Sequence, residues 1–250
     1  MKIQIASDLH TEHKRRSPKL DMTDADVIVL AGDIGVGVPA IDWAADLSQA
    51  HGKPVIFVAG NHEFYHSDYR VTLDALREAA ASRDVLFLEQ DVVVLGGVRF
   101  LGTTLWTDYA CNVQVPPDLA RWIAGKNLAD HEVICFEGRR FRPEDAYRLH
   151  RQATAWLLAQ LAQSSDPTVV VTHHGPSLLC EHPQFGMNDI APCFYSERTD
   201  LVQQADLWIY GHTHANVDIN LDPGHLVSNQ LGYPHELVPG GFDPACVLEL

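Results

Sequence analysis

The sequence has no apolar run long enough to cross a membrane as a helix. About 18 consecutive apolar residues are needed to span the hydrocarbon core of a bilayer, and every apolar run in this chain is much shorter. The first residues, MKIQIASDLH, lack the apolar core of a signal peptide and are typical of a first β-strand. We therefore expect no membrane partner.

Paired cysteines and basic stretches are also missing. The five cysteines form no C-x-x-C pair, which is typical of free thiols in a reducing compartment and predicts a cytoplasmic protein. Only 18 Lys and Arg residues stand against 33 Asp and Glu residues, so the formal net charge is −15. Because such a surface repels phosphate backbones, we do not expect nucleic acid as a partner. The absence of a P-loop and of a G-x-S-x-G motif leaves phosphate-loop and serine-hydrolase functions without support.

Short apolar runs alternate with helical patterns over most of the chain. Several runs are continuous, which favours strands buried on both faces between helices. The runs cover residues 2–6, 27–31, 55–59, 92–95, 98–101, 169–172 and 207–210. Helices are predicted over 41–50, 69–81 and 143–163, and the last forty residues are predicted to be β. We expect a single α/β domain over residues 1–250.

Two segments show no clear period. Residues 104–142 are too long for a simple connection inside a compact domain, so we expect a lid or an inserted element there. Residues 174–196, rich in Pro and Gly in their first half, are a second segment of this kind.

Polar side chains follow five of the apolar runs, at the point where each run ends. Ligands bind outside the carboxyl ends of strands in open α/β sheets, so these side chains are predicted to converge in one crevice. They are Asp8, His10, Asp33, Asn61, His62, Glu63, His173, His174, His212 and His214. Taken singly, an Asp or Asn here is more often a turn residue or helix cap. Turns have no special use for histidine, so the set as a whole favours a functional site.

The types and spacing of these residues point to metal ions. Residues two apart on an extended segment point the same way, so Asp8 with His10, and His212 with His214, can each converge on a cluster. Carboxylate, amide and imidazole ligands without cysteine suit Mn²⁺, Fe, Zn²⁺ or similar ions. Seven such ligands exceed what one catalytic ion with open positions needs, so we expect two divalent ions.

The order of the motifs resembles the calcineurin-like metallophosphoesterase superfamily. The motifs are D-x-H at 8–10, G-D at 32–33, G-N-H-E at 60–63, T-H-H at 172–174 and G-H-T-H at 211–214. They cover most of the chain in the order typical of that superfamily. The resemblance implies a two-sheet β-sandwich flanked by helices, with a dinuclear metal site at the strand ends.

The resemblance also implies a role for each motif residue. Asp8, His10 and His214 would bind one metal, and Asn61, His173 and His212 would bind the other. Asp33 would bridge the two metals, and His62 would be an acid outside the metal shell. His174 competes with His173 as the ligand; we prefer His173 because it follows the strand directly.

The expected function is hydrolysis of a small phosphate ester, a diester or a monoester, by attack of a metal-bridging hydroxide. The two ions would make the site positive inside an acidic protein, and His62 could protonate the leaving oxygen. Tyr65, His174 and Arg139 are candidates for contacts with substrate, alongside His62. The sequence identifies neither the group that orients His62 nor the oligomeric state.

Three other functions are weaker. Gly35, Gly37 and Ala40 fit G-x-G-x-x-A, but Asp33 would repel a pyrophosphate and the next strand lacks an acid for a ribose. A non-catalytic scaffold with the same fold generally loses ligands, and here each one is present. A mononuclear amidohydrolase would usually carry H-x-H on its first strand, where this chain has D-x-H.

Replacing the bridging carboxylate gives a first test. Asp33→Asn keeps the shape of the side chain and removes its charge, so we expect bound metal and phosphoesterase activity to be lost together. Elemental analysis and hydrolysis of p-nitrophenyl esters measure the two losses. Full activity in a correctly folded variant would contradict the bridging role.

Overall fold

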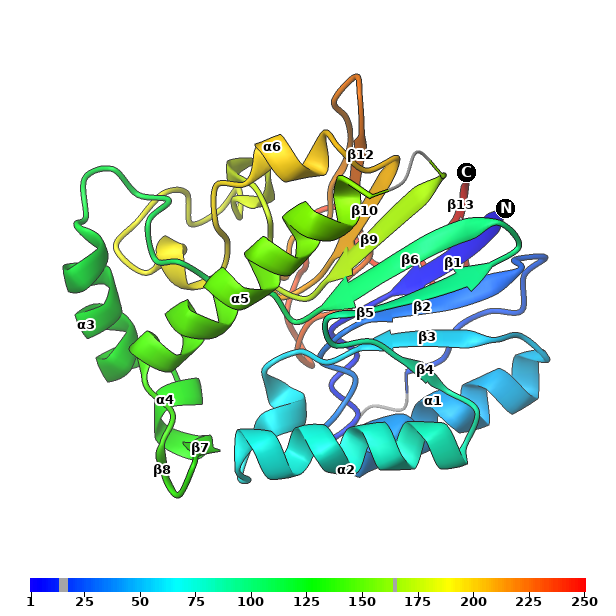
Figure 1. Ribbon diagram of the computed structural model, residues 1–250, viewed down its shortest axis with the longest axis horizontal. Helices are drawn as coiled ribbons and strands as arrows, with labels where there is room; N and C mark the ends of the chain where they lie inside the picture. Colours follow the sequence, from blue (N-terminus) through cyan, green and yellow to red (C-terminus); the bar gives the residue numbers. More distant parts are fainter. Residues whose placement is uncertain (14–17, 164–165) are drawn as a thin grey trace.

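The continuous apolar runs form the strands of two mixed β-sheets (Figure 1). The computed structural model describes residues 1–13, 18–163 and 166–250. The first sheet has the order β13-β1-β2-β3-β4, with β1 to β4 parallel and β13 antiparallel to β1. Its strands are β1 (Lys2–Ala6), β2 (Val27–Ala31), β3 (Val55–Val58), β4 (Leu86–Phe87) and β13 (Val247–Glu249).

The second sheet has a parallel centre and antiparallel edges. Its order is β11-β12-β10-β9-β6-β5, in which β12, β10, β9 and β6 are parallel. The strands are β5 (Asp91–Leu95), β6 (Val98–Thr103), β9 (Thr168–Thr172), β10 (Leu207–Tyr210), β11 (Asp218–Asn220) and β12 (His225–Ser228). After Tyr210 the strands are β11, β12 and β13, and the other residues form loops and turns, so the prediction that the last forty residues are β is wrong for most of them.

Both faces of the central strands are buried, which explains their continuous apolar sequences. In β2, Val27, Val29 and Ala31 pack in the core between the two sheets. The alternating residues, Ile28 and Leu30, pack in a separate core under the helices. The predicted two-sheet sandwich flanked by helices is therefore confirmed.

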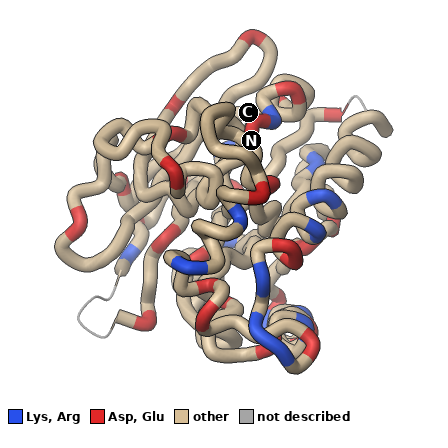
Figure 2. The backbone as a smooth tube through the Cα atoms, turned by 90° about the vertical axis from the view of Figure 1, so that its left-hand side faces the viewer, with Lys and Arg blue, Asp and Glu red and all other residues tan. Residues whose placement is uncertain are grey.

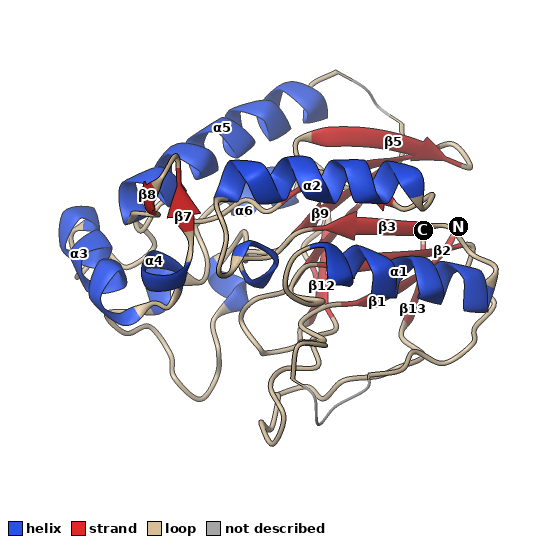
Figure 3. Cartoon of the chain, turned by 90° about the horizontal axis from the view of Figure 1, so that it is seen from below, coloured by secondary structure: helices blue, strands red, loops and turns tan. Residues whose placement is uncertain are grey.

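Helices cover the outer face of each sheet. Helices α1 (Val38–His51) and α2 (Tyr69–Ser82) lie along the first sheet, as Figure 3 shows from below. Helices α5 (Pro143–Leu161) and α6 (Thr199–Val202) cover the second sheet. Among the described residues, no helix is long and apolar enough to cross a membrane.

The segment without a clear period contains a helix that the sequence pattern does not predict. Residues 104–142 include α3 (Pro117–Asn127), α4 (Asp130–Val133) and a small hairpin of β7 (Cys135–Phe136) and β8 (Arg139–Arg140). In α3 only Ala120 and Ala124 are buried, whereas Leu119 and Trp122 are exposed. Because large apolar residues lie on its solvent face, the helical period of α3 is blurred.

The carboxyl ends of the two sheets meet directly. The backbone N–H of Ser7, after β1, donates to the carbonyl of Asn229, after β12, over 3.0 Å. The N–H of Leu231 donates back to the carbonyl of Ser7. Between β2 and β9, the ring of His173 lies 2.9 Å from the carbonyl oxygen of Ala31. Strand ends from both sheets therefore form one rim.

Candidate metal centre

Two groups of metal-ligating atoms lie at this rim. In the first, Nε2 of His214 is 3.4 Å from Oδ1 of Asp8 and 3.2 Å from Nε2 of His10. In the second, Nε2 of His173 is 3.0 Å from Oδ1 of Asn61 and 3.1 Å from Nδ1 of His212. The side chains come from both sheets, so the site depends on the packing of one sheet against the other.

Asp33 lies between the two groups. Its Oδ1 is 3.4 Å from Nε2 of His173, and its Oδ2 is 4.0 Å from Nε2 of His10. The exposed fraction of its side chain is only 3%. One carboxylate thus presents an oxygen to each group, the arrangement that a bridging ligand requires.

The spacing of the donor atoms fits metal ions. Two ligands of one ion, each about 2.0–2.2 Å from it, lie roughly 3.0–3.5 Å apart. The distances within each group, 3.2 and 3.4 Å in one and 3.0 and 3.1 Å in the other, fall in this range. The contact of Asp33 with the second group, 3.4 Å, also falls in it, whereas its contact with His10 of the first group is longer, 4.0 Å. The donors are oxygens and imidazole nitrogens, which suits Mn²⁺, Fe or Zn²⁺.

Three of the predicted histidine ligands have a hydrogen-bond partner at Nδ1, the ring nitrogen that faces away from the donor group. Nδ1 of His10 is 3.1 Å from Oε1 of Glu12, and Nδ1 of His214 is 2.6 Å from Oε2 of Glu236. Nδ1 of His173 faces the carbonyl of Ala31. These acceptors hold the proton on Nδ1, so that Nε2 of each ring is the acceptor directed at the group.

The backbone at these positions is unusual. Five of the seven predicted ligands have a positive φ, a conformation that costs non-glycine residues on the order of 1 kcal/mol or more each. They are Asp8 (53°), His10 (48°), Asp33 (53°), His212 (71°) and His214 (49°). The expectation that the D-x-H and H-x-H segments are extended is therefore wrong. Tight left-handed turns, rather than strand alternation, direct these side chains inward.

Two glycines are required by close packing beside the ligands. A Cβ on Gly211 would lie 2.6 Å from Oδ2 of Asp8 and 3.0 Å from the carbonyl oxygen of Ala31. A Cβ on Gly60 would overlap Oδ1 of Asp33. No side chain fits at either position without moving a ligand.

Glu63 connects two loops of the site through backbone hydrogen bonds. Its buried carboxylate accepts backbone N–H groups from Asp33 (3.0 Å), Ile34 (2.8 Å), Gly35 (3.2 Å) and Gly60 (2.6 Å). Burial and the nearby Asp33 carboxylate raise the pKa of Glu63 to about 7. This one side chain ties the loop after β2 to the loop after β3.

His62 lies beside the two groups and is oriented by Glu12. Nδ1 of His62 is 2.9 Å from the same Oε1 of Glu12 that receives His10. Its Nε2 lies 3.1 Å from the Tyr233 hydroxyl and 3.8 Å from Oδ2 of Asp33. Burial lowers the pKa of His62, but Asp33 and Glu12 outweigh this effect and raise it to about 9.

Asn61 is held by the inserted segment. Its Nδ2 donates to Oδ1 of Asp130 over 2.9 Å, which directs its Oδ1 toward His173. The Tyr65 hydroxyl donates to the same oxygen of Asp130 over 2.8 Å, and the Tyr65 ring stacks on His62. Helix α4 therefore positions a ligand from a distance of about seventy residues in sequence.

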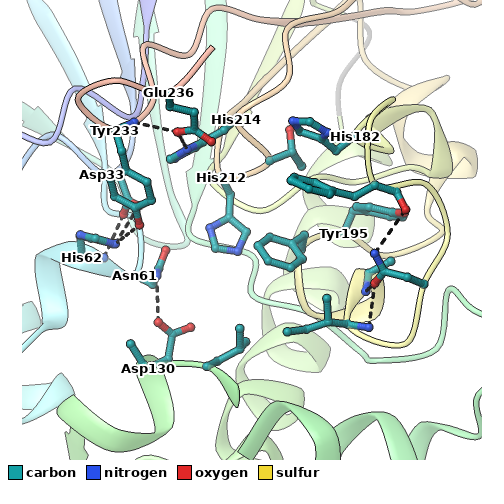
Figure 4. A pocket seen from close by; sticks show the side chains of 18 of the residues that line it. Asp33, Asn61, His62, Asp130, His182, Tyr195, His212, His214, Tyr233 and Glu236 are labelled. Carbon is teal, nitrogen blue, oxygen red and sulfur yellow. Dashed lines mark hydrogen bonds and ion pairs between the residues drawn. The ribbon is translucent and has the colours of Figure 1, made fainter. Parts of the chain in front are cut away.

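A cavity of about 470 Å³ opens over the site. Figure 4 shows Asp33, Asn61 and His62 on one side of it and Tyr195 and His182 on the other, with His212 between them. The far wall comes from the second unpatterned segment, which includes η2 (Leu178–Cys180) and η3 (Ala191–Cys193). Segment 174–196 thus forms a wall of the cavity.

The structure distributes the predicted substrate contacts unevenly. Tyr65 and His62 line the cavity. His174 does not line it; its ring lies behind His212, with centroids 4.1 Å apart. Arg139 is directed elsewhere, because its guanidinium donates two hydrogen bonds to Asp145 of α5, at 2.5 and 2.8 Å. The position of Arg139 therefore does not support the prediction that this residue contacts substrate.

Several side chains at the site were not identified from the sequence. They are Glu12, Asp130, Tyr233 and Glu236. Glu12 extends D-x-H to D-x-H-x-E, a spacing that could have signalled it. Nothing local to Asp130 or Glu236 signals a role, because each acts through a partner far away in the chain.

Residues 1–216 match the calcineurin-like phosphoesterase family. The chain belongs to this family.

Relatives share this similarity over nearly the whole chain. Uncharacterized protein L509 of Acanthamoeba polyphaga mimivirus is 24% identical, covering 93% of this chain and 86% of that protein. [Acyl-carrier-protein] phosphodiesterase PptH of Mycobacterium tuberculosis is 23% identical, covering 92% of this chain and 77% of that protein. The crystal structure of that organism's phosphopantetheinyl hydrolase PptH has the same fold, with a TM-score of 0.73, 22% identity, and 93% and 90% of the two chains covered.

The ion pair of Arg139 gives a second test. Because Arg139 stabilises the buried carboxylate of Asp145, Arg139→Ala should lower the Tm while leaving kcat/KM within about twofold. Burial raises the pKa of Asp145, but the hydrogen bonds from Arg139 outweigh burial and lower it. A lowered pKa stabilises the fold above the unfolded value of about 4 and ceases to do so as the pH falls through the folded value.

The Tm difference from the parent protein should therefore be larger near about pH 7 than near about pH 3. Arg140→Ala, at the exposed neighbouring position, is the matched control. A large loss of kcat/KM with an unchanged Tm would instead place Arg139 at the substrate.

Proposed function

We propose that this chain is a dinuclear metal-dependent phosphodiesterase that hydrolyses a small phosphodiester. The observation that carries the proposal is the pair of donor groups sharing Asp33 at the floor of the cavity. Asp8, His10 and His214 would bind one divalent ion, and Asn61, His173 and His212 the other. Divalent ions in such a site lower the pKa of water and offset charge on the phosphate.

His62 would donate a proton to the leaving oxygen. Its Nδ1 is held by Glu12, so its Nε2 is the atom that faces the cavity. Tyr65 stacks on one face of the ring at 4.2 Å, and the Tyr233 hydroxyl lies at Nε2. These contacts fix the ring plane, so the proton is presented at one place beside Asp33.

The charges around the cavity favour a diester over a monoester. No Lys or Arg is among the described residues that line it, whereas the carboxyl groups of Asp130 and Glu236 do line it. A phosphodiester carries one negative charge and a monoester at neutral pH carries nearly two. Positive charge comes from the two ions and from the His62 side chain, whose pKa is raised to about 9, without any Lys or Arg, so the diester is bound at lower electrostatic cost.

The charge of the protein favours a small substrate over a long nucleic acid. Figure 2 shows Asp and Glu positions interspersed with Lys and Arg positions on the side of the molecule that carries α3. The net charge of −15 disfavours long nucleic acids. The name of the Mycobacterium tuberculosis relative, a phosphodiesterase, agrees with a diester substrate. A cytoplasmic location remains a prediction from the five scattered cysteines.

Hydrolysis of two chromogenic esters tests the proposal. The protein, stripped of metal and reloaded with Mn²⁺, should hydrolyse bis-p-nitrophenyl phosphate faster than p-nitrophenyl phosphate. Removing the metal with a chelator should abolish both activities. Preference for the monoester would overturn the diester assignment. Inactivity toward both esters with two ions bound would favour a scaffold.

Glu12→Gln tests the orientation of His62. Glutamine keeps the size of the side chain but cannot accept two N–H groups on a charged oxygen, so kcat should fall about 10- to 100-fold. The loss should be larger for esters with poor leaving groups, since these depend most on proton donation. Asp21→Asn, an exposed acid outside the site, is a control. Equal losses for good and poor leaving groups would show that Glu12 acts only through His10.

A further inference from the structure

The cavity has two chemically different halves. The inner half is formed by the predicted ligands with His62, Tyr65, Asp130, Tyr233 and Glu236. The outer half is lined mainly by apolar side chains: Leu128, Ala129, Phe185, Ile190, Ala191, Phe194 and Tyr195. In Figure 4, Tyr195 lies across the cavity from Asp33 and His62. A ligand with phosphorus at the inner half must therefore place one substituent among apolar groups.

The apolar half begins directly at the ligands. The ring centroids of Phe194 and His212 are 5.1 Å apart. The apolar surface therefore begins next to a predicted metal ligand.

Two polar side chains of the outer half, those of Asn188 and His182, accept hydrogen bonds from nearby backbone N–H groups. Oδ1 of Asn188 accepts the N–H groups of Ile190 and Ala191, at 2.9 and 3.0 Å, and its Nδ2 donates to the backbone carbonyl of Phe185. Nδ1 of His182 accepts the N–H of Gln184 at 3.2 Å. The buried hydroxyl of Tyr195 has no hydrogen-bond partner among the described residues. Most of the remaining lining side chains are apolar, so recognition there depends mainly on apolar contact.

Charged substituents find no counter-ion there. Among the described residues that line the cavity, none is Lys or Arg. A second phosphate or a carboxylate on the substrate would lose its hydration without a compensating partner, which is unfavourable.

We infer that the preferred substrates are phosphodiesters in which one substituent is a long, uncharged and largely apolar chain. The chain occupies the outer half, and Phe185 with Ile190 contributes to its selection. This inference rests on the proposed function and adds the class of substituent that the site accepts.

A series of alkyl p-nitrophenyl phosphates tests the inference on the Mn²⁺-loaded protein. In each reaction a water oxygen bonds to phosphorus, the bond to the nitrophenyl oxygen breaks, and p-nitrophenolate leaves with the bonding electrons. The hexyl ester should exceed the methyl ester in kcat/KM by at least about tenfold, because buried methylenes favour binding. A chain of the same length ending in a carboxylate should lose most of this gain.

A matched pair of variants assigns the effect to the cavity. Phe185 and Trp122 are both aromatic and both 63% exposed, but only Phe185 lines the cavity. Phe185→Ala should reduce the hexyl-to-methyl ratio about threefold to tenfold, and Trp122→Ala should leave the ratio unchanged. Ile190→Ala should act in the same direction as Phe185→Ala.

Other results would contradict either the inference or the proposed function. Equal kcat/KM values for the hexyl, methyl and carboxylate-ended esters would overturn the inference but leave the proposed phosphodiesterase intact. Faster hydrolysis of a nucleoside p-nitrophenyl phosphate than of the hexyl ester would also overturn it. Hydrolysis of none of these diesters would overturn the proposed function itself.

Discussion

The arrangement of the site depends on one buried carboxylate, that of Glu63. It accepts four backbone N–H groups, three from the loop after β2 and one from the loop after β3. These loops carry Asp33 and Asn61, so their separation is set by the reach of a single side chain. The interaction is strong because four backbone donors converge on one carboxyl group away from water. It allows the strained backbone at Asp33 to persist, since the surrounding hydrogen bonds over-determine it.

A second layer of acceptors extends the same principle to the side chains. Glu12, Glu236 and the carbonyl of Ala31 each receive Nδ1 of a different histidine, and Asp130 receives the amide of Asn61. The ligands are thus oriented before any ion binds, and less side-chain entropy is lost when one does. Glu12 serves both His10 and His62 through a single oxygen, which couples the metal ligand to the outer histidine. Segment 104–142 orients Asn61 through Asp130, so this segment is part of the site although most of its residues lie away from the predicted ligands.

The cavity combines an inner half suited to an anion with an outer half that is apolar. Its inner half must bind an anion in a protein of net charge −15. Carboxylates around it would repel phosphate unless divalent ions reversed the local field. Its outer half is apolar and carries no Lys or Arg among the described lining residues. Membership of the calcineurin-like phosphoesterase family explains the inner half. The outer half comes mainly from segment 174–196 together with the link between α3 and α4, parts of the chain without a regular sequence pattern.

The sequence by itself determined most of the longer strands and predicted the donor residues of the candidate metal centre. Runs such as VIVLA are apolar throughout because β2 is buried on both faces, and the motifs after the strands carry their chemistry in the residue types. Tertiary structure decided the rest. Helix α3 was not predicted because Leu119 and Trp122 face solvent and interrupt the helical pattern of apolar residues. Arg139 was directed away by Asp145, and Glu12, Asp130 and Glu236 gained their roles only when distant segments packed together. A local pattern records which faces of an element are buried, but a hydrogen bond between residues far apart in sequence leaves no local period.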